Sequence, residues 1–129
     1  MTRYAEVIGD PIAQSKSPAI HNHWIKQLGI DAHYDREHVR ADALADYIAR
    51  RADDPQWAGC NVTMPHKLSV MEHLDTLDPL AKQIGAVNTV VREADGSLAG
   101  YNTDAAGFLE PLAEDLAQQH YFRMARVLG

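Results

Sequence analysis

Short apolar runs alternate with segments of helical spacing along the first hundred residues of the chain. The runs that end at turn-forming residues predict five strands, over residues 4–8, 33–39, 58–62, 89–92 and 98–101. The second of these is more polar and suits the edge of a sheet, whereas the third is short and suits its centre. Asp95-Gly96 lies between the last two and predicts a tight hairpin.

Helices are predicted where apolar residues recur every three or four positions. Ser17 followed by Pro18 marks a helix start, with the Ser17 hydroxyl as the N-cap. Ile20, Trp24 and Leu28 then form one apolar face, which we assign to core packing. Further helical segments are expected over residues 41–51, 68–74 and 79–84, with a last helix up to residue 117 after a tight turn at 104–107. Strands that alternate with helices are typical of the α/β class.

Composition and charge narrow the class of protein. The 129 residues suffice for one domain, and 46% of them are hydrophobic, as in ordinary globular proteins. The net charge of −6 disfavours nucleic acid and anionic membranes as partners, and no segment approaches the ~20 apolar residues of a membrane span. Because Cys60 is the single cysteine and the N-terminus lacks signal-peptide features, we expect a cytoplasmic protein.

The segment Gln14-Ser15-Lys16-Ser17-Pro18 places two hydroxyls next to a predicted helix N-terminus. Hydroxyls together with exposed helix N–H groups hold carboxylates and phosphates. Taken alone, the segment is explained more simply by Ser17 capping the helix and Ser15 lying in a turn.

Polar residues also follow the predicted central strand. Asn61 and Thr63 lie at its carboxyl end, where open α/β sheets bind ligands. Lys67 opens the next segment, and a lysine at such a place can serve as a general acid or base. The simpler explanation for Lys67 alone is a solvated surface side chain.

Two further polar residues flank the predicted hairpin. Asn88 begins its first strand and Asp104 follows its second, so both side chains are expected to converge at one edge of the sheet. Asp104 alone is explained better by an N-cap of the following helix, or equally by a surface ion pair.

Taken together, the four segments resemble the shikimate dehydrogenase family. They read Ser-Lys-Ser-Pro-x-Ile-His-Asn at residues 15–22, Asn-Val-Thr-x-Pro-x-Lys at 61–67, Gly-Ala-x-Asn-Thr at 85–89 and Gly-x-Asn-Thr-Asp at 100–104. The resemblance implies an α/β three-layer sandwich, with a mostly parallel sheet flanked by helices on both faces. It also implies that this domain binds shikimate or 3-dehydroshikimate.

The resemblance implies a role for each matching residue. Ser15 and Ser17 would bind the substrate carboxylate. The residues that would contact the ring hydroxyls are Asn61, Thr63, Asn88 and Asp104. Lys67 would be the catalytic proton donor and acceptor, and Asp104 would orient the same oxygen and hold Lys67 in place.

The family's cofactor site is implied but has no counterpart in this sequence. NADP would be bound by a Rossmann domain, and the Gly-x-Gly-x-x-Gly turn of such a domain occurs nowhere in the chain. We therefore expect a substrate-binding domain over residues 1–117, followed by a linker and the first Rossmann strand over 118–129. The chain is expected to be inactive by itself.

The expected function is the substrate-binding and catalytic half of an NADP-dependent shikimate dehydrogenase, acting as a monomer or homodimer. A non-catalytic shikimate-binding module and an NAD-using quinate/shikimate dehydrogenase are the alternatives. No metal site is expected, because His21 and His23 lie about 200° apart on a helix and cannot chelate one ion. Cys60 is assigned to the packed face of the sheet, and His66 is assigned no role.

Overall fold

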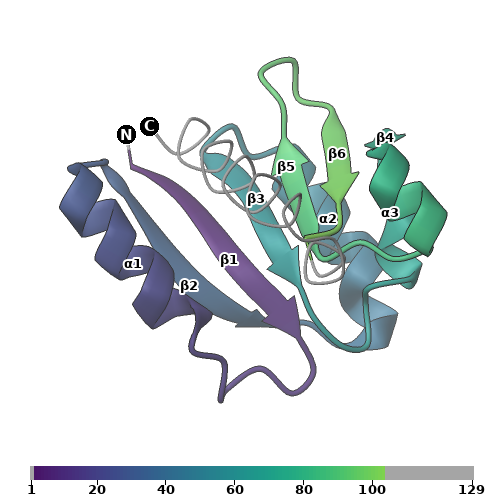
Figure 1. Cartoon of the computed structure of the whole chain (residues 1–129), viewed down its shortest axis with the longest axis horizontal. Coiled ribbons are helices and arrows are strands. Elements are labelled where there is room, and N and C mark those ends of the chain that lie inside the picture. The colour runs from purple at the N-terminus through teal and green to yellow at the C-terminus, as the bar shows by residue number, and fades with distance from the viewer. Residues whose placement is uncertain (1, 104–129) are drawn as a thin grey trace, which may run out of the picture.

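The computed structural model describes residues 2–103, which form one six-stranded sheet with accompanying helices (Figure 1). The strands are β1 (Arg3–Gly9), β2 (Ala32–His38), β3 (Trp57–Val62), β4 (Thr76–Leu77), β5 (Thr89–Arg92) and β6 (Leu98–Tyr101). The helices are α1 (Ser17–Leu28), α2 (Leu44–Ala52) and α3 (Pro79–Ile84), with 3-10 helices η1 (Ala41–Ala43) and η2 (Ser69–His73). The predicted closing helix, the linker and the strand at 118–129 lie outside the described residues.

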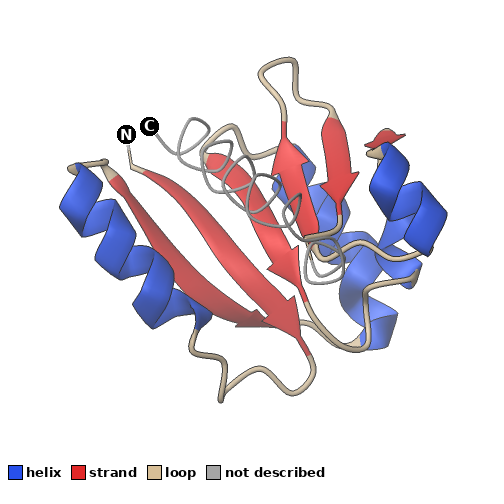
Figure 2. Cartoon of the chain, viewed as in Figure 1, coloured by secondary structure: helices blue, strands red, loops and turns tan. Residues whose placement is uncertain are grey.

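The sheet order is β2-β1-β3-β5-β6-β4, and β5 alone of these strands runs antiparallel to its neighbours (Figure 2). The prediction of a mostly parallel sheet is therefore confirmed, as are the five predicted strands and the β5-β6 hairpin. The more polar strand β2 lies at an edge of the sheet, and β3 lies near its centre between β1 and β5, as the sequence predicts.

Alternate residues of the strands face opposite sides of the sheet and pack against different helices. The α2-side cluster contains strand residues together with residues of α2 and α3, namely Ile8, Trp57, Cys60, Val90, Leu44, Tyr47, Ile48 and Ala81 among others. The α1-side cluster contains Ala5, Val7, Ile12, Ile25, Tyr34, Ala58 and Val91. Helices thus cover both faces of the sheet, which confirms the expected α/β three-layer arrangement.

The apolar face predicted for α1 is wrong. Ile20, Trp24 and Leu28 are 49%, 37% and 64% exposed, whereas Ile25 is the residue of this helix that is buried against the sheet. Trp24, which we assigned to the core, therefore lies mostly outside it. The apolar spacing marked a stripe of the helix but not the side that faces the sheet.

Polar side chains hold α1 against the edge strand instead. The Asn22 amide donates to the Tyr34 carbonyl at 2.7 Å and accepts from the Tyr34 N–H at 2.9 Å, so it completes the hydrogen bonding of β2 at that point. The His21 ring stacks on the Tyr34 ring with 4.2 Å between their centroids. Apolar periodicity carries no information about such contacts, and for this reason the orientation of α1 was predicted incorrectly.

Two smaller differences lie between β3 and β5. The helix predicted over residues 68–74 is only the 3-10 helix η2, and Leu68, where the predicted helix begins, is 70% exposed. The two-residue strand β4 was not predicted, because so short a segment has no periodicity. The short helix α3 is confirmed, and Asp78 caps it by accepting from the Leu80 N–H at 3.2 Å.

β3 and β5 approach each other unusually closely at Gly59. Its φ is +151°, and a Cβ atom added there would lie 2.1 Å from the Val90 carbonyl oxygen. Only glycine fits this position. The close approach brings the carboxyl end of β3 beside the start of β5, where the predicted site residues lie.

None of the helices within residues 2–103 is long and apolar enough to cross a bilayer.

Candidate functional site

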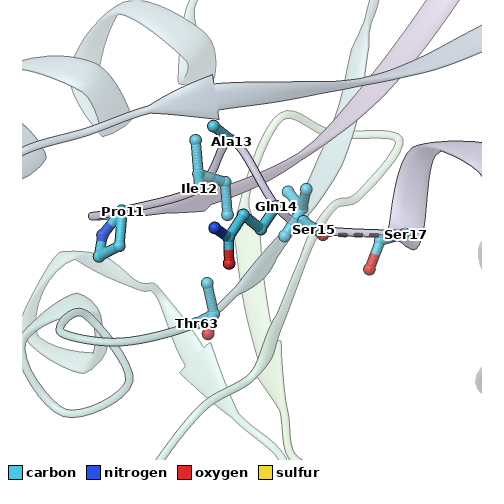
Figure 3. Close-up of a pocket in the computed structure, with 8 residues that line it drawn as sticks. Pro11, Ile12, Ala13, Gln14, Ser15, Ser17 and Thr63 are labelled. Carbon is cyan, nitrogen blue, oxygen red and sulfur yellow. Dashed lines mark hydrogen bonds between the residues drawn. The ribbon is translucent and has the colours of Figure 1, made fainter.

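The serine loop, defined as residues 10–17, connects β1 to α1 and carries both predicted carboxylate ligands. The Ser17 N–H donates to Ser15 Oγ at 3.2 Å (Figure 3), and the Ser15 N–H donates to the Ile12 carbonyl at 3.0 Å. The N-cap position is Lys16 and its side chain makes no capping bond, so the prediction that Ser17 caps the helix is wrong. Ser17 is already helical, and the Ser15 hydroxyl satisfies its N–H instead.

A cavity of about 430 Å³ lies between the serine loop and the residues that follow β3 (Figure 3). Its lining residues are Val7, Pro11, Ile12, Ala13, Gln14, Ser15, Ser17 and Thr63. The structure thus brings together three predicted site residues that are far apart in sequence, Ser15, Ser17 and Thr63. A mainly apolar cavity with a few hydroxyls is suited to a small polar molecule.

The lysine loop, defined as residues 63–67, runs beside the serine loop. The Asp10 N–H donates to the Met64 carbonyl at 3.0 Å, and the Thr63 N–H donates to the Ile8 carbonyl at 3.0 Å. Gly9 lies at this crossing, where a Cβ atom would be 2.4 Å from Thr63 Cγ2 and 3.0 Å from the Met64 carbonyl oxygen. The absence of a side chain at Gly9 therefore allows the two loops to meet at the cavity.

The amide network, defined as Asn61, Thr89, Asn88 and Thr103, joins β3 to β5 and to the residues after β6. Asn61 Nδ2 donates to Thr89 Oγ1 at 3.1 Å, and that hydroxyl donates to Asn88 Oδ1 at 3.0 Å. Asn88 binds Thr103 twice, by donating from Nδ2 to Oγ1 at 2.8 Å and by accepting from the N–H at 3.0 Å. The Val62 N–H also donates to the Asn88 carbonyl at 2.7 Å.

These bonds determine how each amide is oriented and what it can offer a ligand. Asn61 Oδ1 accepts from the Tyr34 hydroxyl at 2.5 Å, so its oxygen and nitrogen are distinguished by their partners. Each amide has two N–H groups, and the bonds to Thr89 and Thr103 use one from Asn61 and one from Asn88. The second N–H of each can donate to a ligand oxygen. Asn61 is the register partner of Val7, which lines the cavity, but no residue of the amide network is itself among the lining residues.

Lys67 ends the lysine loop and is half-buried. Its carbonyl accepts from the Val87 N–H at 2.8 Å, so its backbone lies next to the residue that precedes Asn88. Lys67 is not one of the residues that line the cavity. Asp104 lies outside the described residues, and its role stays a prediction.

Two side chains near the cavity were missed in the sequence. Tyr34 is fully buried, and its hydroxyl reaches Asn61 from the edge strand β2. The Gln14 side chain turns from the serine loop towards Thr63 (Figure 3). Gln14 lies inside a segment that we singled out for its serines, and that position was the available signal. The contact of Tyr34 depends on the pairing of distant strands, for which no local pattern exists.

The structure confirms that Cys60 lies in the packed α2-side cluster. The thiol is fully buried, and this burial raises its pKa well above the ordinary value, which makes it unsuited to nucleophilic chemistry. Within residues 2–103 no group of three or more His, Cys, Asp or Glu side chains is placed to hold a metal ion.

The described residues do not fit a dinucleotide. Pyrophosphate binding typically uses a glycine-rich turn that leads from a strand directly into a helix. The connection from β1 to α1, residues 10–16, contains no glycine, and the Ser17 N–H at the start of α1 is already bonded to Ser15 Oγ. This connection therefore does not have the features of a pyrophosphate-binding turn.

Comparisons with known proteins agree with this geometry. Residues 7–90 match the family model described as the shikimate dehydrogenase substrate binding domain. The chain is 63% identical over 111 residues to the shikimate dehydrogenase (NADP(+)) of Sphingopyxis alaskensis. The matched region covers 86% of this chain and 40% of that protein. The chain thus spans well under half the length of this curated relative.

Solved structures show the same fold. A shikimate 5-dehydrogenase of Listeria monocytogenes in complex with shikimate and NAD superposes with a TM-score of 0.80 at 38% identity, covering 88% of this chain and 39% of that one. A 5-ketofructose reductase of a Gluconobacter species gives 0.79 at 35% identity, covering 87% and 40%. On the strength of the matching family model, this chain belongs to the shikimate dehydrogenase family, with residues 7–90 corresponding to its substrate-binding domain.

Proposed function

We propose that this chain is the substrate-binding half of an NADP-dependent shikimate dehydrogenase, with shikimate and 3-dehydroshikimate as its ligands. The observation that supports this best is the meeting of Ser15, Ser17 and Thr63 in one cavity, with Asn61 of the amide network paired in register with the lining residue Val7. The S. alaskensis relative is named for this activity, and the L. monocytogenes relative was solved in complex with shikimate.

The serine loop is the proposed carboxylate site. Ser15 Oγ accepts the Ser17 N–H, so its own hydroxyl hydrogen can be donated to a ligand oxygen, as can that of Ser17. The amino-terminal end of α1 carries partial positive charge, which attracts an anion. The Arg36 guanidinium, whose Nη2 donates to the Ser15 carbonyl at 2.8 Å, adds a full positive charge nearby.

The amide network and Thr63 are the proposed contacts for the ring hydroxyls. Asn61 and Asn88 each have a second amide N–H to donate, and Thr63 is one of the residues that line the cavity. The apolar side chains of Val7 and Ile12 would lie against the carbon ring. A polyhydroxylated ring acid therefore matches both kinds of surface.

Lys67 is the proposed proton donor and acceptor, with Asp104 as its partner. When a ring ketone is reduced, its oxygen gains negative charge and then a proton, and an adjacent ammonium can stabilise the charge and supply the proton. The hydride would come from NADP held outside the residues described here. The reverse reaction returns the proton from the hydroxyl to Lys67.

A calorimetric titration of the chain tests the carboxylate site. The double variant Ser15→Ala, Ser17→Ala is expected to weaken shikimate binding about 100-fold or more, because each of the two lost hydrogen bonds to a charged group contributes roughly 1.5–3 kcal/mol. An analogue without the carboxylate should lose far less. Ser69→Ala, at an exposed serine in η2, is the matched control.

Equal losses for both ligands would contradict the carboxylate assignment. The Gluconobacter relative, named for a ketosugar, suggests the decisive competitor. 5-Ketofructose has no carboxylate, so we expect it to bind this chain more weakly than shikimate. Preferential binding of 5-ketofructose would overturn the proposed substrate class while leaving the family assignment intact.

A further inference from the structure

His66, in the lysine loop, is fully buried and has no part in the function proposed above. Its ring Nε2 is hydrogen-bonded to the Val39 carbonyl, just beyond the end of β2. Because a carbonyl can only accept, Nε2 carries the ring proton and Nδ1 is left as an acceptor. Nδ1 has no hydrogen-bond partner in the part of the chain that the structure describes.

Packing alone does not account for an imidazole at this position. A buried polar atom without a partner lowers stability, and a phenyl ring would fill a similar space without that cost. What the imidazole has and a phenyl ring lacks is the Nε2–H bond to Val39. The reason for a histidine here is therefore to be sought in what that bond holds together.

Val39 is bonded on both sides and links the two loops of the site. Its N–H donates to the Gly9 carbonyl at 3.1 Å, and its carbonyl accepts from His66. Gly9 directly precedes the serine loop, and His66 directly precedes Lys67. Val39, which follows β2, is thus hydrogen-bonded both to the residue that precedes the serine loop and to the residue that precedes Lys67.

The backbone of His66 is also bonded at both ends. Its N–H donates to the Thr63 carbonyl at 3.0 Å, and its carbonyl accepts from the Val70 N–H at 3.0 Å. The next residue, Lys67, has its carbonyl on the Val87 N–H at 2.8 Å. Because this stretch is bonded at several points, a displaced His66 ring would shift the lysine loop as a unit.

We propose that His66 is a positioning residue that holds the serine loop and Lys67 at a fixed separation through its bond to Val39. This inference rests on the proposed function, in which one substrate contacts both. The requirement is a hydrogen-bond donor at the place of Nε2, not an aromatic ring.

Three variants of the chain separate this role from a merely structural one. His66→Phe keeps the volume and loses the donor, whereas His66→Gln keeps an N–H donor near the place of Nε2. Val70→Ala, at a fully buried position in the same region, lowers stability without removing a bond of His66. Shikimate affinity by calorimetry is one readout, and amide hydrogen exchange at Asp10 and Val39 relative to Val90 of β5 is the other.

His66→Phe is expected to weaken shikimate binding at least fivefold and to speed exchange at Asp10 and Val39 at least fivefold relative to Val90. His66→Gln should stay within twofold of the parent in both readouts, and Val70→Ala should do the same despite a lower Tm. Parent-like loop exchange in His66→Phe would overturn the inference, as would equal effects in all three variants. Failure of the parent chain to bind shikimate would contradict the proposed function, while the exchange ratio would still decide whether His66 couples the loops.

Discussion

The amide network and the serine loop both carry predicted site residues but are held in place by different kinds of contact. Within the network, side chains bond to side chains, and the central hydroxyl of Thr89 is fully buried. The serine loop is held mainly through its backbone, by bonds between its own residues, by the Asp10 N–H bond to the Met64 carbonyl and by Arg36 at its surface. Gln14 and Lys16, on either side of Ser15, are exposed.

This difference indicates that the two regions have different roles in ligand binding. Groups that are oriented before the ligand arrives lose little freedom on binding, so the network is suited to fixing the ring in one orientation. The serine loop contributes hydroxyls and positive charge, which attract a carboxylate without needing so exact a geometry. Disrupting the network should therefore damage stability and reaction, whereas disrupting the loop should mainly weaken binding.

The largest effect is expected from a substitution of Gly59, because the position of the amide network depends on this residue. Gly59→Ala places a Cβ atom 2.1 Å from the Val90 carbonyl oxygen and requires a φ of +151°. We expect a loss of more than about 3 kcal/mol in the free energy of unfolding, because the β3-β5 pair must separate. Urea unfolding followed by circular dichroism measures this.

Gly29→Ala is the matched control for the backbone effect. Gly29 also has a positive φ, +67°, but a Cβ atom there would meet nothing within 4 Å. Its replacement should cost only about 1–2 kcal/mol from the left-handed conformation. Similar losses for both variants would show that strain at the backbone, not the close approach of β3 and β5, makes Gly59 necessary.

Lys67→Ala tests whether the reaction depends on the network side of the site. In an enzyme that joins this chain to the remainder of the S. alaskensis shikimate dehydrogenase (NADP(+)), beyond the region that this chain matches, kcat should fall about 100-fold or more, with a smaller change in KM. Lys67→Arg should not restore it, because a guanidinium does not release a proton near neutral pH. An active Arg variant would mean that position 67 supplies charge rather than a proton.

How much of this was predictable from the sequence depended on the type of contact. The strands and the β5-β6 hairpin were predicted because apolar runs and Asp95-Gly96 are local signals. The orientation of α1 was not, since Asn22 and His21 hold it by polar contacts with Tyr34 on another strand. The motif residues were found through a family resemblance, which gave their identities but not the bonds between them.

The amide network is an example of bonds that the family resemblance did not reveal. Asn61 and Asn88 were given roles from the motifs, whereas Thr89, which belongs to the same motif as Asn88 and connects the two, was given none. A threonine at the start of a strand has many ordinary explanations in a sequence. Its function as a link becomes evident only when the antiparallel register sets Asn61 opposite Thr89.

Thr89→Val removes one hydroxyl from the amide network while preserving the shape of the side chain. Asn61 Nδ2 and Asn88 Oδ1 each lose a buried partner, so unfolding should become easier by about 1–3 kcal/mol. Shikimate binding should also weaken, because Asn61 is no longer held in one orientation. Thr76→Val, at an exposed position in β4, should change neither quantity appreciably. A Thr89 variant of parent stability and affinity would show that the network does not orient the amides.

The smallest effect is expected from pH, and it arises on the serine-loop side. His21 donates from Nδ1 to the Ser17 carbonyl at 2.9 Å and stacks on Tyr34, and burial lowers its pKa from the ordinary 6.5. Between that lowered pKa and 6.5 the unfolded chain binds more protons than the folded one, so stability rises with pH in this window.

Acidification through pH 6.5 should therefore destabilise the parent chain, while His21→Phe, which keeps the stacked ring, should lose that part of the slope. His23→Phe, at an exposed position of the same helix, should keep it. Unfolding midpoints in urea at about pH 5.5, 6.5 and 7.5, chosen around the ordinary histidine pKa, make the measurement. If shikimate affinity also falls on acidification in the parent but not in His21→Phe, the serine loop responds to this histidine as well; an unchanged slope in His21→Phe would show that another group sets the acid sensitivity.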